Sequence, residues 1–232
     1  MAGPIREKLL EMQRKSRAKY SHDIVDPEER KKSQHYQDWV DHGILRYRWH
    51  NFSEFAPGMY RSNHPNHERF VSYRDMGIKT VLNLRGKTHH SHYYFEVESC
   101  EKLGMSLIDI PMSARAVPPV DTLVELMDIL ESLSEPTLMH CKSGADRTGI
   151  AAAIYLMHIL DRPVEEARKM LSFDFLHIKF SATGILDYVI DMYARRVEKE
   201  PIPFRTWVMS EYEPLTARAE FDAMGFWDRT KL

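Results

Sequence analysis

Short apolar runs alternate with amphipathic stretches from about residue 55 onward, and this alternation predicts strands and helices in turn. In the amphipathic stretches apolar residues recur every three or four positions, so that Leu123, Leu126, Met127 and Leu130, for example, share one face of a helix. Strands are predicted at 57–63, 79–86, 105–112 and 136–141, and the helices between them at 67–76, 93–103 and 120–133.

A largely apolar helix is predicted at 147–160, directly after the last strand, and further helices at 164–171 and 184–197. Short apolar strands separated by helices form a parallel sheet with helices on both faces. The predicted fold class is therefore α/β, with a mainly parallel central sheet flanked by helices. Ligands of such folds bind outside the carboxyl ends of the strands, so functional residues are expected there.

The ends of the chain have a different pattern. Residues 4–19 place Ile5, Leu9 and Met12 at helical spacing among an excess of Lys and Arg, which predicts a weakly amphipathic basic helix. Such a helix packs on the protein, which is the commoner arrangement, or lies on an anionic membrane. Residues 21–34 are polar and charged, so we predict a linker or surface loop there.

We divide the chain into a helical extension and linker at 1–54, a compact domain at 55–200 and an aromatic-rich extension at 201–232. The last segment holds Phe204, Trp207, Phe221, Phe226 and Trp227. Exposed aromatic side chains could insert into lipid, but those of a terminal segment more often pack on the protein itself. We expect this second arrangement.

Composition excludes several classes of protein. Of 232 residues, 43% are apolar and 28% charged, and the formal net charge of -2 gives no bulk attraction to nucleic acid. The longest apolar stretch, 149–160, is well short of the roughly 20 residues that cross a bilayer, and the N-terminus lacks the apolar region of a secretory signal. Two cysteines, Cys100 and Cys141, provide no disulfide framework. We therefore expect a cytoplasmic protein, either free or peripheral at the inner membrane face.

The candidate chemistry lies in the sequence HCKSGADRTG, residues 140–149, between the last strand and the apolar helix. A strand, a tight loop and a helix N-terminus bind anions, because backbone N–H groups and the helix dipole point at the ligand. Gly144 allows the turn. The same positive field favours the nucleophilic thiolate of Cys141. Arg147, separated from Cys141 by five residues, is placed to fold over the loop and bind a phosphate in bidentate fashion.

A buried cysteine at the end of a strand is usually only a small apolar residue, and a Cys and an Arg at this spacing alone are a weak signal. Here His, Cys, two Gly, Arg and Thr occur in order within a predicted strand, loop and helix, so we favour a catalytic role. The residues predicted to bind the substrate phosphate are Lys142, Ser143, Gly144, Ala145, Asp146 and Arg147.

Residues 140–149 resemble the active-site loop H-C-x-x-G-x-x-R-[ST]-G of the cysteine-based protein tyrosine phosphatase superfamily, in its compact dual-specificity branch. The resemblance covers about residues 55–197 and implies a dual-specificity-phosphatase-like fold. It implies that Cys141 forms a cysteinyl-phosphate intermediate, that Arg147 binds substrate and transition state, and that Thr148 stabilises the thiolate as it leaves. His140 would orient the loop, or is simply part of the core.

Four further segments are similar to a bacterial subgroup of the superfamily: AKYSHDI (18–24), YRSNHP (60–65), VLNLRG (81–86) and FRTWVMSEYEP (204–214). That subgroup is similar to the phosphatases that dephosphorylate phosphatidylglycerophosphate, a lipid precursor. This resemblance implies a phospholipid substrate.

The leaving group needs a proton, and three aspartates compete for the role of general acid. Asp109, at the end of a predicted strand, resembles the acid of the superfamily's mobile loop. Asp146 precedes Arg147 inside the phosphate loop, as in similar loops of phosphoinositide phosphatases. We favour Asp109, because a carboxyl on a separate loop reaches the leaving group opposite the nucleophile. Asp121 is better explained as the first-turn residue of a helix.

The positions of several cations favour a substrate with more than one anionic group. Lys142, Arg61, Arg85, Lys87 and Arg115 all lie at predicted strand ends or in the loops that follow. Each of them could equally be an ordinary solvated charge. The leading hypothesis is a phosphatidylglycerophosphate or phosphoinositide head group at a membrane. The alternatives are a tyrosine or dual-specificity protein phosphatase and a phosphate-binding pseudophosphatase.

A group of histidines, His89, His90 and His92, shows no metal-ligand spacing with a fourth residue. The thiolate mechanism needs no metal either. The sequence therefore assigns no metal site and no cofactor, and we expect these histidines at the start of a helix, lining the rim of the pocket.

Overall fold

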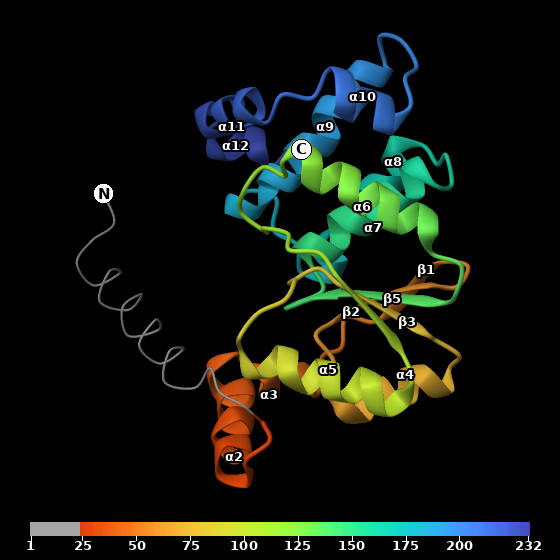
Figure 1. Cartoon of the computed structure of the whole chain (residues 1–232). Helices are drawn as coiled ribbons and strands as arrows, with labels where there is room; N and C mark the ends of the chain where they lie inside the picture. Colours follow the sequence, from red (N-terminus) through yellow and green to blue (C-terminus); the bar gives the residue numbers. More distant parts are fainter. Residues whose placement is uncertain (1–23) are drawn as a thin grey trace, which may run out of the picture.

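The computed structural model describes residues 24–232, so the predicted helix at 4–19 lies outside the described residues. A five-stranded sheet lies between two layers of helices (Figure 1). The strand order is β1-β2-β5-β3-β4, in which only the pair β1 and β2 is antiparallel. The strands are β1 (Ser53–Ala56), β2 (Met59–Asn63), β3 (Thr80–Asn83), β4 (Ser106–Asp109) and β5 (Thr137–Cys141). The sheet is mixed, with the predicted parallel majority.

One layer of helices consists of α4 and α5, and the other begins with α6 and α7 and continues into α9 to α12 (Figure 1). The bounds of the longer helices are α4 (His67–Asp75), α5 (Ser91–Leu103), α6 (Val120–Ser132), α7 (Asp146–His158), α9 (Ile185–Val197), α10 (Phe204–Ser210) and α11 (Pro214–Ala223). The short ones are α8 (Val164–Ala167), η2 (Arg168–Met170), η3 (Phe173–Phe175), η4 (Ala182–Gly184) and α12 (Phe226–Arg229).

Alternation along the central strands divides the core into two clusters. Val81 and Leu138 point toward α4 and α5, whereas Leu82 and Met139 point toward α6 and α7. All four side chains are fully buried, as expected for strands covered on both faces. The predicted apolar face of α6 lies in the larger cluster. The sheet is thereby held rigidly from both sides, which fixes the positions of its strand ends.

The four predicted strands and the predicted helices are present, with boundaries that differ by a few residues. Strand β1 was not predicted, because its four residues carry no clear alternation. The segment predicted at 164–171 is α8 followed by a turn of 3-10 helix.

The prediction of a linker or loop at 21–34 is wrong over its second half. Residues Pro27–His35 form helix α2, followed by a short π-helix η1 (Tyr36–Val40) and by α3 (Gly43–Arg46). Asp26 caps α2, accepting hydrogen bonds from the backbone N–H groups of Glu28 and Glu29, and Pro27 occupies the first helical position. These local start signals outweigh the polar composition.

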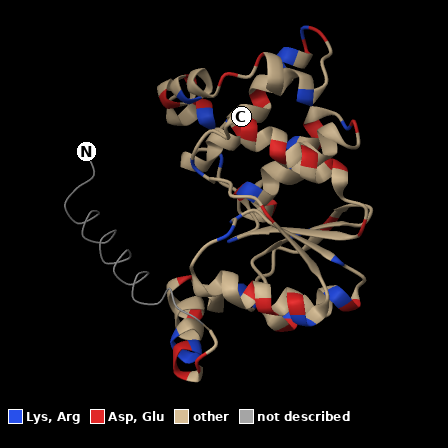
Figure 2. Cartoon of the chain, viewed as in Figure 1, with Lys and Arg blue, Asp and Glu red and all other residues tan. Residues whose placement is uncertain are grey.

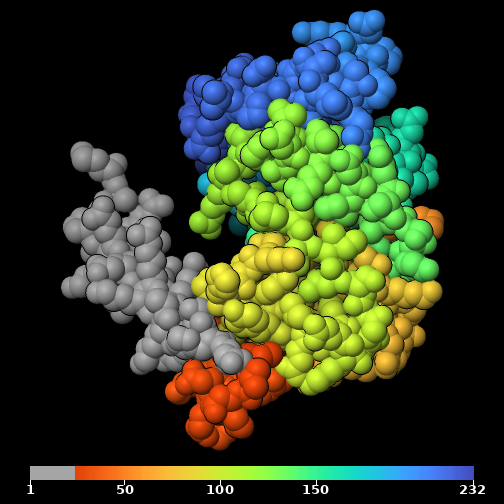
Figure 3. Space-filling model, in the orientation of Figure 1, coloured from red at the N-terminus to blue at the C-terminus, as the bar shows by residue number. Residues whose placement is uncertain are grey.

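The N-terminal and C-terminal segments lie against opposite helical layers. Helix α2 contacts α5, and Arg30 forms an ion pair with Glu98 at 2.6 Å (Figure 3). At the other end, Phe204, Trp207 and Phe221 are buried, whereas Phe226 and Trp227 are exposed. Within residues 24–232, no helix combines the length and apolar character needed to span a membrane.

Candidate active site

The phosphate-loop sequence forms a tight turn at the carboxyl end of the central strand. Strand β5 ends at Cys141 and α7 begins at Asp146. Gly144 has a φ of +75°, and a Cβ at this position would meet the carbonyl carbon and oxygen of Ser62 at 2.7 Å. Only glycine fits this backbone, because the loop is pressed against the end of β2.

Two side chains hold the loop carbonyls from outside. Arg61 donates a 2.7 Å hydrogen bond to the Gly144 carbonyl, and Asn51 donates a 3.0 Å bond to the Ser143 carbonyl. With these carbonyls bound outside, the backbone N–H groups turn inward; that of Gly144 lies 3.3 Å from the Cys141 sulfur. The loop therefore forms a nest of donors around Cys141.

Arg61 was expected beside the pocket, and the structure corrects this. Its side chain is fully buried, bonds to the Met170 carbonyl as well, and lies over the ring of Phe175 at 3.5 Å. Arg61 thus supports the phosphate loop from behind.

Cys141 is buried at the base of the nest. Burial alone would raise the pKa of its thiol, but the charge of Arg147 and hydrogen bonds from Thr148 lower that pKa below its usual value. A cysteine with a lowered pKa is a nucleophile rather than an inert core residue. Cys100 is the contrast, since burial in α5 raises its pKa to about 12.

Arg147 has hydrogen-bonding capacity that the protein does not use. Among residues 24–232, its buried Nε has no hydrogen-bond partner. A buried guanidinium donor without an acceptor is costly unless a ligand supplies one. Its position at the start of α7, beside Cys141, suits it to bind an anion held in the loop.

Asp146 belongs to a buried network of charges. His177 Nδ1 lies 2.7 Å from Asp146 Oδ1, and His177 Nε2 is hydrogen bonded to Asp187. Burial disfavours the charged imidazole, but the two carboxylates prevail and raise the pKa of His177 to about 9. His177 is therefore a cation that fixes the orientation of Asp146, whose side chain remains partly exposed.

Asp109 lies farther from the nucleophile. It ends the edge strand β4, and β3 separates this strand from β5. Asn83 donates a 2.8 Å hydrogen bond to one carboxylate oxygen, and the Tyr93 hydroxyl donates a 2.7 Å bond to the other. Asp121 is exposed in the first turn of α6. The structure places Asp146 in the loop and Asp109 outside it, and the identity of the general acid stays a prediction.

A cluster of cations surrounds one buried carboxylate beside the loop. Asp41, from the segment between η1 and α3, lies 3.0 Å from Arg85, 2.9 Å from Arg46 and 3.2 Å from Lys142 of the loop. Burial would raise the pKa of Asp41, but Arg85, His92 and Arg46 hold it well below its usual range. Three cations thus share one anion. Figure 2 shows Lys and Arg positions at the end of the sheet where the chain enters α7.

Other predicted rim residues are placed differently. Lys87 and Arg115 are exposed, and no described contact joins either to the phosphate loop. His92 was expected to line the rim, but it is buried in α5 with 3% of its surface exposed. The first turn of α5 faces the core, which the polar letters of this segment did not reveal.

Comparison with known proteins agrees with this geometry. Residues 56–160 match the family model described as polymorphic toxin system, DSP-PTPase phosphatase. These residues form a dual-specificity-type, cysteine-based phosphatase domain. The domain includes the whole phosphate loop and both candidate acids.

Two curated proteins are similar to the phosphatase domain. An inositol diphosphatase from Arabidopsis thaliana is 26% identical over 43% of this chain and 50% of its own length. A dual specificity protein phosphatase from Pseudomonas aeruginosa is 28% identical over 45% of each chain. The chain thus spans about half the length of the curated relatives it matches.

A solved phosphatase-like structure from Shewanella putrefaciens has the same fold as the phosphatase domain. Its TM-score is 0.54 at 16% identity, and the match covers 66% of this chain and 95% of that one. The predicted dual-specificity-phosphatase-like α/β fold is confirmed.

Proposed function

We propose that the chain is a cysteine-dependent phosphatase that hydrolyses phosphoric monoesters through a cysteinyl-phosphate intermediate. The observation that carries this proposal is the Cys141 sulfur at the base of a nest of inward N–H groups, beside the unused donor of Arg147. Charge on a phosphoryl group at this point would be stabilised by donors that are already in place.

The reaction takes two steps. The Cys141 thiolate attacks phosphorus, and the sulfur–phosphorus bond forms as the bond to the leaving oxygen breaks. That oxygen takes a proton from a carboxylic acid, Asp109 or Asp146. A water molecule then attacks phosphorus, the carboxylate accepts its proton, and the thiolate leaves toward the Thr148 hydroxyl. Inorganic phosphate and an alcohol are the products.

We further propose a substrate with a second anionic group, namely a phospholipid head group such as phosphatidylglycerophosphate or a phosphoinositide. Arg46, Arg85 and Lys142 outnumber the single carboxylate of Asp41 next to the loop, which supports the binding of a second anion. A similar protein carries the name inositol diphosphatase, and polyphosphorylated inositols share this chemistry.

An exposed apolar rim supports a substrate at a lipid surface. The segment 173–180 reaches the loop, because Asn51 joins the Ser143 and Phe175 carbonyls and His177 contacts Asp146. Its outer side chains and those of α12 are exposed: Phe173, Leu176, Ile178, Phe180, Phe226 and Trp227. The rings of Phe180 and Phe226 lie 5.1 Å apart, which joins the two segments into one patch. Aromatic side chains of this kind suit a membrane interface.

The test is phosphate release from phosphatidylglycerophosphate vesicles, phosphoinositide vesicles and a phosphotyrosine peptide, with Cys141→Ser as the inactive control. We expect turnover of the lipids, and a higher KM for Lys142→Gln. The matched control Lys87→Gln, which changes a distant exposed lysine, should keep the wild-type KM.

Turnover of the peptide alone would replace the lipid proposal by the second candidate, a tyrosine or dual-specificity protein phosphatase, which the name of the Pseudomonas relative favours. Phosphate binding without any turnover would indicate a pseudophosphatase, although phosphate binding by itself does not require a lowered thiol pKa.

A further inference from the structure

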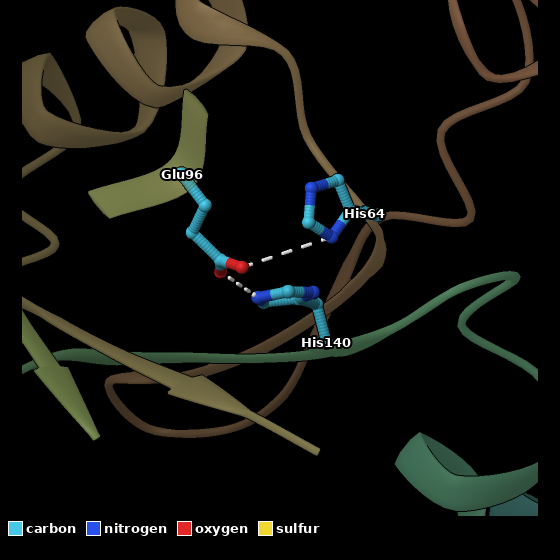
Figure 4. A group of neighbouring side chains, drawn as sticks. All are labelled: His64, Glu96 and His140. Atoms are coloured by element: carbon cyan, nitrogen blue, oxygen red, sulfur yellow. Dashed lines mark hydrogen bonds and ion pairs between the residues drawn. The ribbon is translucent and has the colours of Figure 1, made fainter. Parts of the chain in front are cut away.

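Three side chains that can bind a metal meet behind the phosphate loop. His64 follows β2, His140 precedes Cys141 in β5, and Glu96 lies on α5. Figure 4 shows the three side chains pointing toward one another from these separate segments. His140 Nε2 lies 2.5 Å from Glu96 Oε1, and His64 Nδ1 lies 3.9 Å from Glu96 Oε2. All three are at most 2% exposed.

The cluster has more acceptors than the protein satisfies. His64 Nδ1 and Glu96 Oε2 are buried without a hydrogen-bond partner anywhere in the described part of the chain. The two arginines nearby, Arg46 and Arg85, are already paired with Asp41. A buried carboxylate without a full set of donors is unfavourable, and a cation would remove this deficit.

We propose that His64 Nδ1, Glu96 Oε2 and His140 Nε2 bind one zinc ion. The candidate ligand atoms lie within 4.8 Å of one another. Zinc bonds of about 2.0–2.1 Å in a tetrahedron place neighbouring ligand atoms about 3.3 Å apart, so the 3.9 Å separation closes slightly and the 2.5 Å one opens. Two imidazoles and one carboxylate are a donor set that zinc accepts.

A fourth nitrogen is adjacent. His92 packs edge-on against His64 with ring centroids 5.5 Å apart, and its buried Nε2 also lacks a partner among residues 24–232. His92 and Glu96 are four residues apart on α5, so they share one helix face. Zinc binding displaces the proton between His140 and Glu96, which leaves to solvent. The ion joins β2, β5 and α5 next to the nucleophile and so stabilises the base of the loop.

The test uses the full chain carrying Cys141→Ser, so that the nucleophile cannot bind metal. Protein from zinc-supplemented cultures is dialysed against metal-free buffer, and its zinc content is measured by mass spectrometry. We expect about one zinc per chain, a cobalt-substituted form without thiolate charge-transfer bands, and zinc affinity lowered at least about a hundredfold by Glu96→Gln or His64→Gln. His89→Gln, which changes an exposed histidine of the same segment, should retain the zinc.

Circular dichroism and thermal unfolding identify any variant that fails to fold. His64→Gln remains decisive if Glu96→Gln unfolds, because no hydrogen bond of the His64 ring is lost with it. Absence of zinc from the starting protein, equal zinc in folded His64→Gln, or thiolate bands in the cobalt form would overturn the proposal.

Discussion

The two candidate acids differ in how their carboxylates are held. Asn83 and Tyr93 each donate to Asp109, and these bonds must loosen if it is to reach a leaving group. Asp146 is fixed by His177 and lies next to Arg147 in the loop. Proton transfer by either residue should matter most for poor leaving groups, because good ones leave without a proton.

We predict that Asp109→Asn lowers kcat on an alkyl phosphate by 10²- to 10⁴-fold, with a much smaller effect on an aryl phosphate. The measurement is kcat for both substrates, with Asp121→Asn as the exposed control. Wild-type turnover of the alkyl phosphate by Asp109→Asn would move the acid role to Asp146, and Asp146→Asn should then show the selective loss.

His177 makes stability depend on pH. Its folded-state pKa is raised from 6.5 to about 9, so its contribution is complete below pH 6.5 and disappears as pH rises through about 9. This shift corresponds to about 3 kcal/mol at most. Urea unfolding at pH 6 and pH 9.5 should show that loss in the wild type and in His89→Gln, and a much smaller one in His177→Gln. Identical pH dependence in all three proteins would contradict the assignment.

Cys141, Arg147 and the residues between them were predictable because they are contiguous in the sequence. Their partners were not: Asn51, Arg61 and His177 reach the loop from distant segments through hydrogen bonds that no local pattern encodes. The metal-binding potential of His64, Glu96 and His140 was missed for the same reason. His64 was read only as part of a family-like segment.

At the scale of elements, the passage from β5 through the loop into α7 depends on one backbone conformation. We predict that Gly144→Ala greatly lowers kcat and destabilises the protein, because alanine both disfavours the positive φ and meets the Ser62 backbone at 2.7 Å. Gly104→Ala is the matched control. Gly104 has a φ of +65° but nothing within 4 Å of an added Cβ, so this change should lower Tm with little effect on kcat. Equal effects on kcat would contradict the close approach.

The order and type of the central elements followed from hydrophobic periodicity, since long apolar patterns such as that of α6 leave few alternatives. Two short elements escaped prediction. Strand β1 is defined by its pairing with β2, and α2 is defined by its capping residues, and neither has a strong apolar pattern. Composition therefore indicated a loop where local capping and tertiary contacts produce a helix.

At the scale of the whole molecule, Asp41 joins the N-terminal segment to the phosphatase domain. We predict that Asp41→Asn destabilises the protein by about 3 kcal/mol, because it leaves the buried Arg46 and Arg85 without their anion. Inorganic phosphate should raise the Tm of this variant more than that of the wild type by supplying a replacement anion. Chemical denaturation with Asp75→Asn as an exposed control checks this; an unchanged stability of Asp41→Asn would show that the cluster is not coupled to folding.

The most direct test of the account is to trap the intermediate. The full chain is mixed with excess aryl phosphate, quenched in acid within milliseconds, and the peptide containing Cys141 is analysed by mass spectrometry. The account predicts a phosphoryl group on Cys141 that forms before steady-state phosphate release, and neither this adduct nor turnover in Cys141→Ser. Steady turnover without phosphorylated Cys141, or turnover retained by Cys141→Ser, would contradict it.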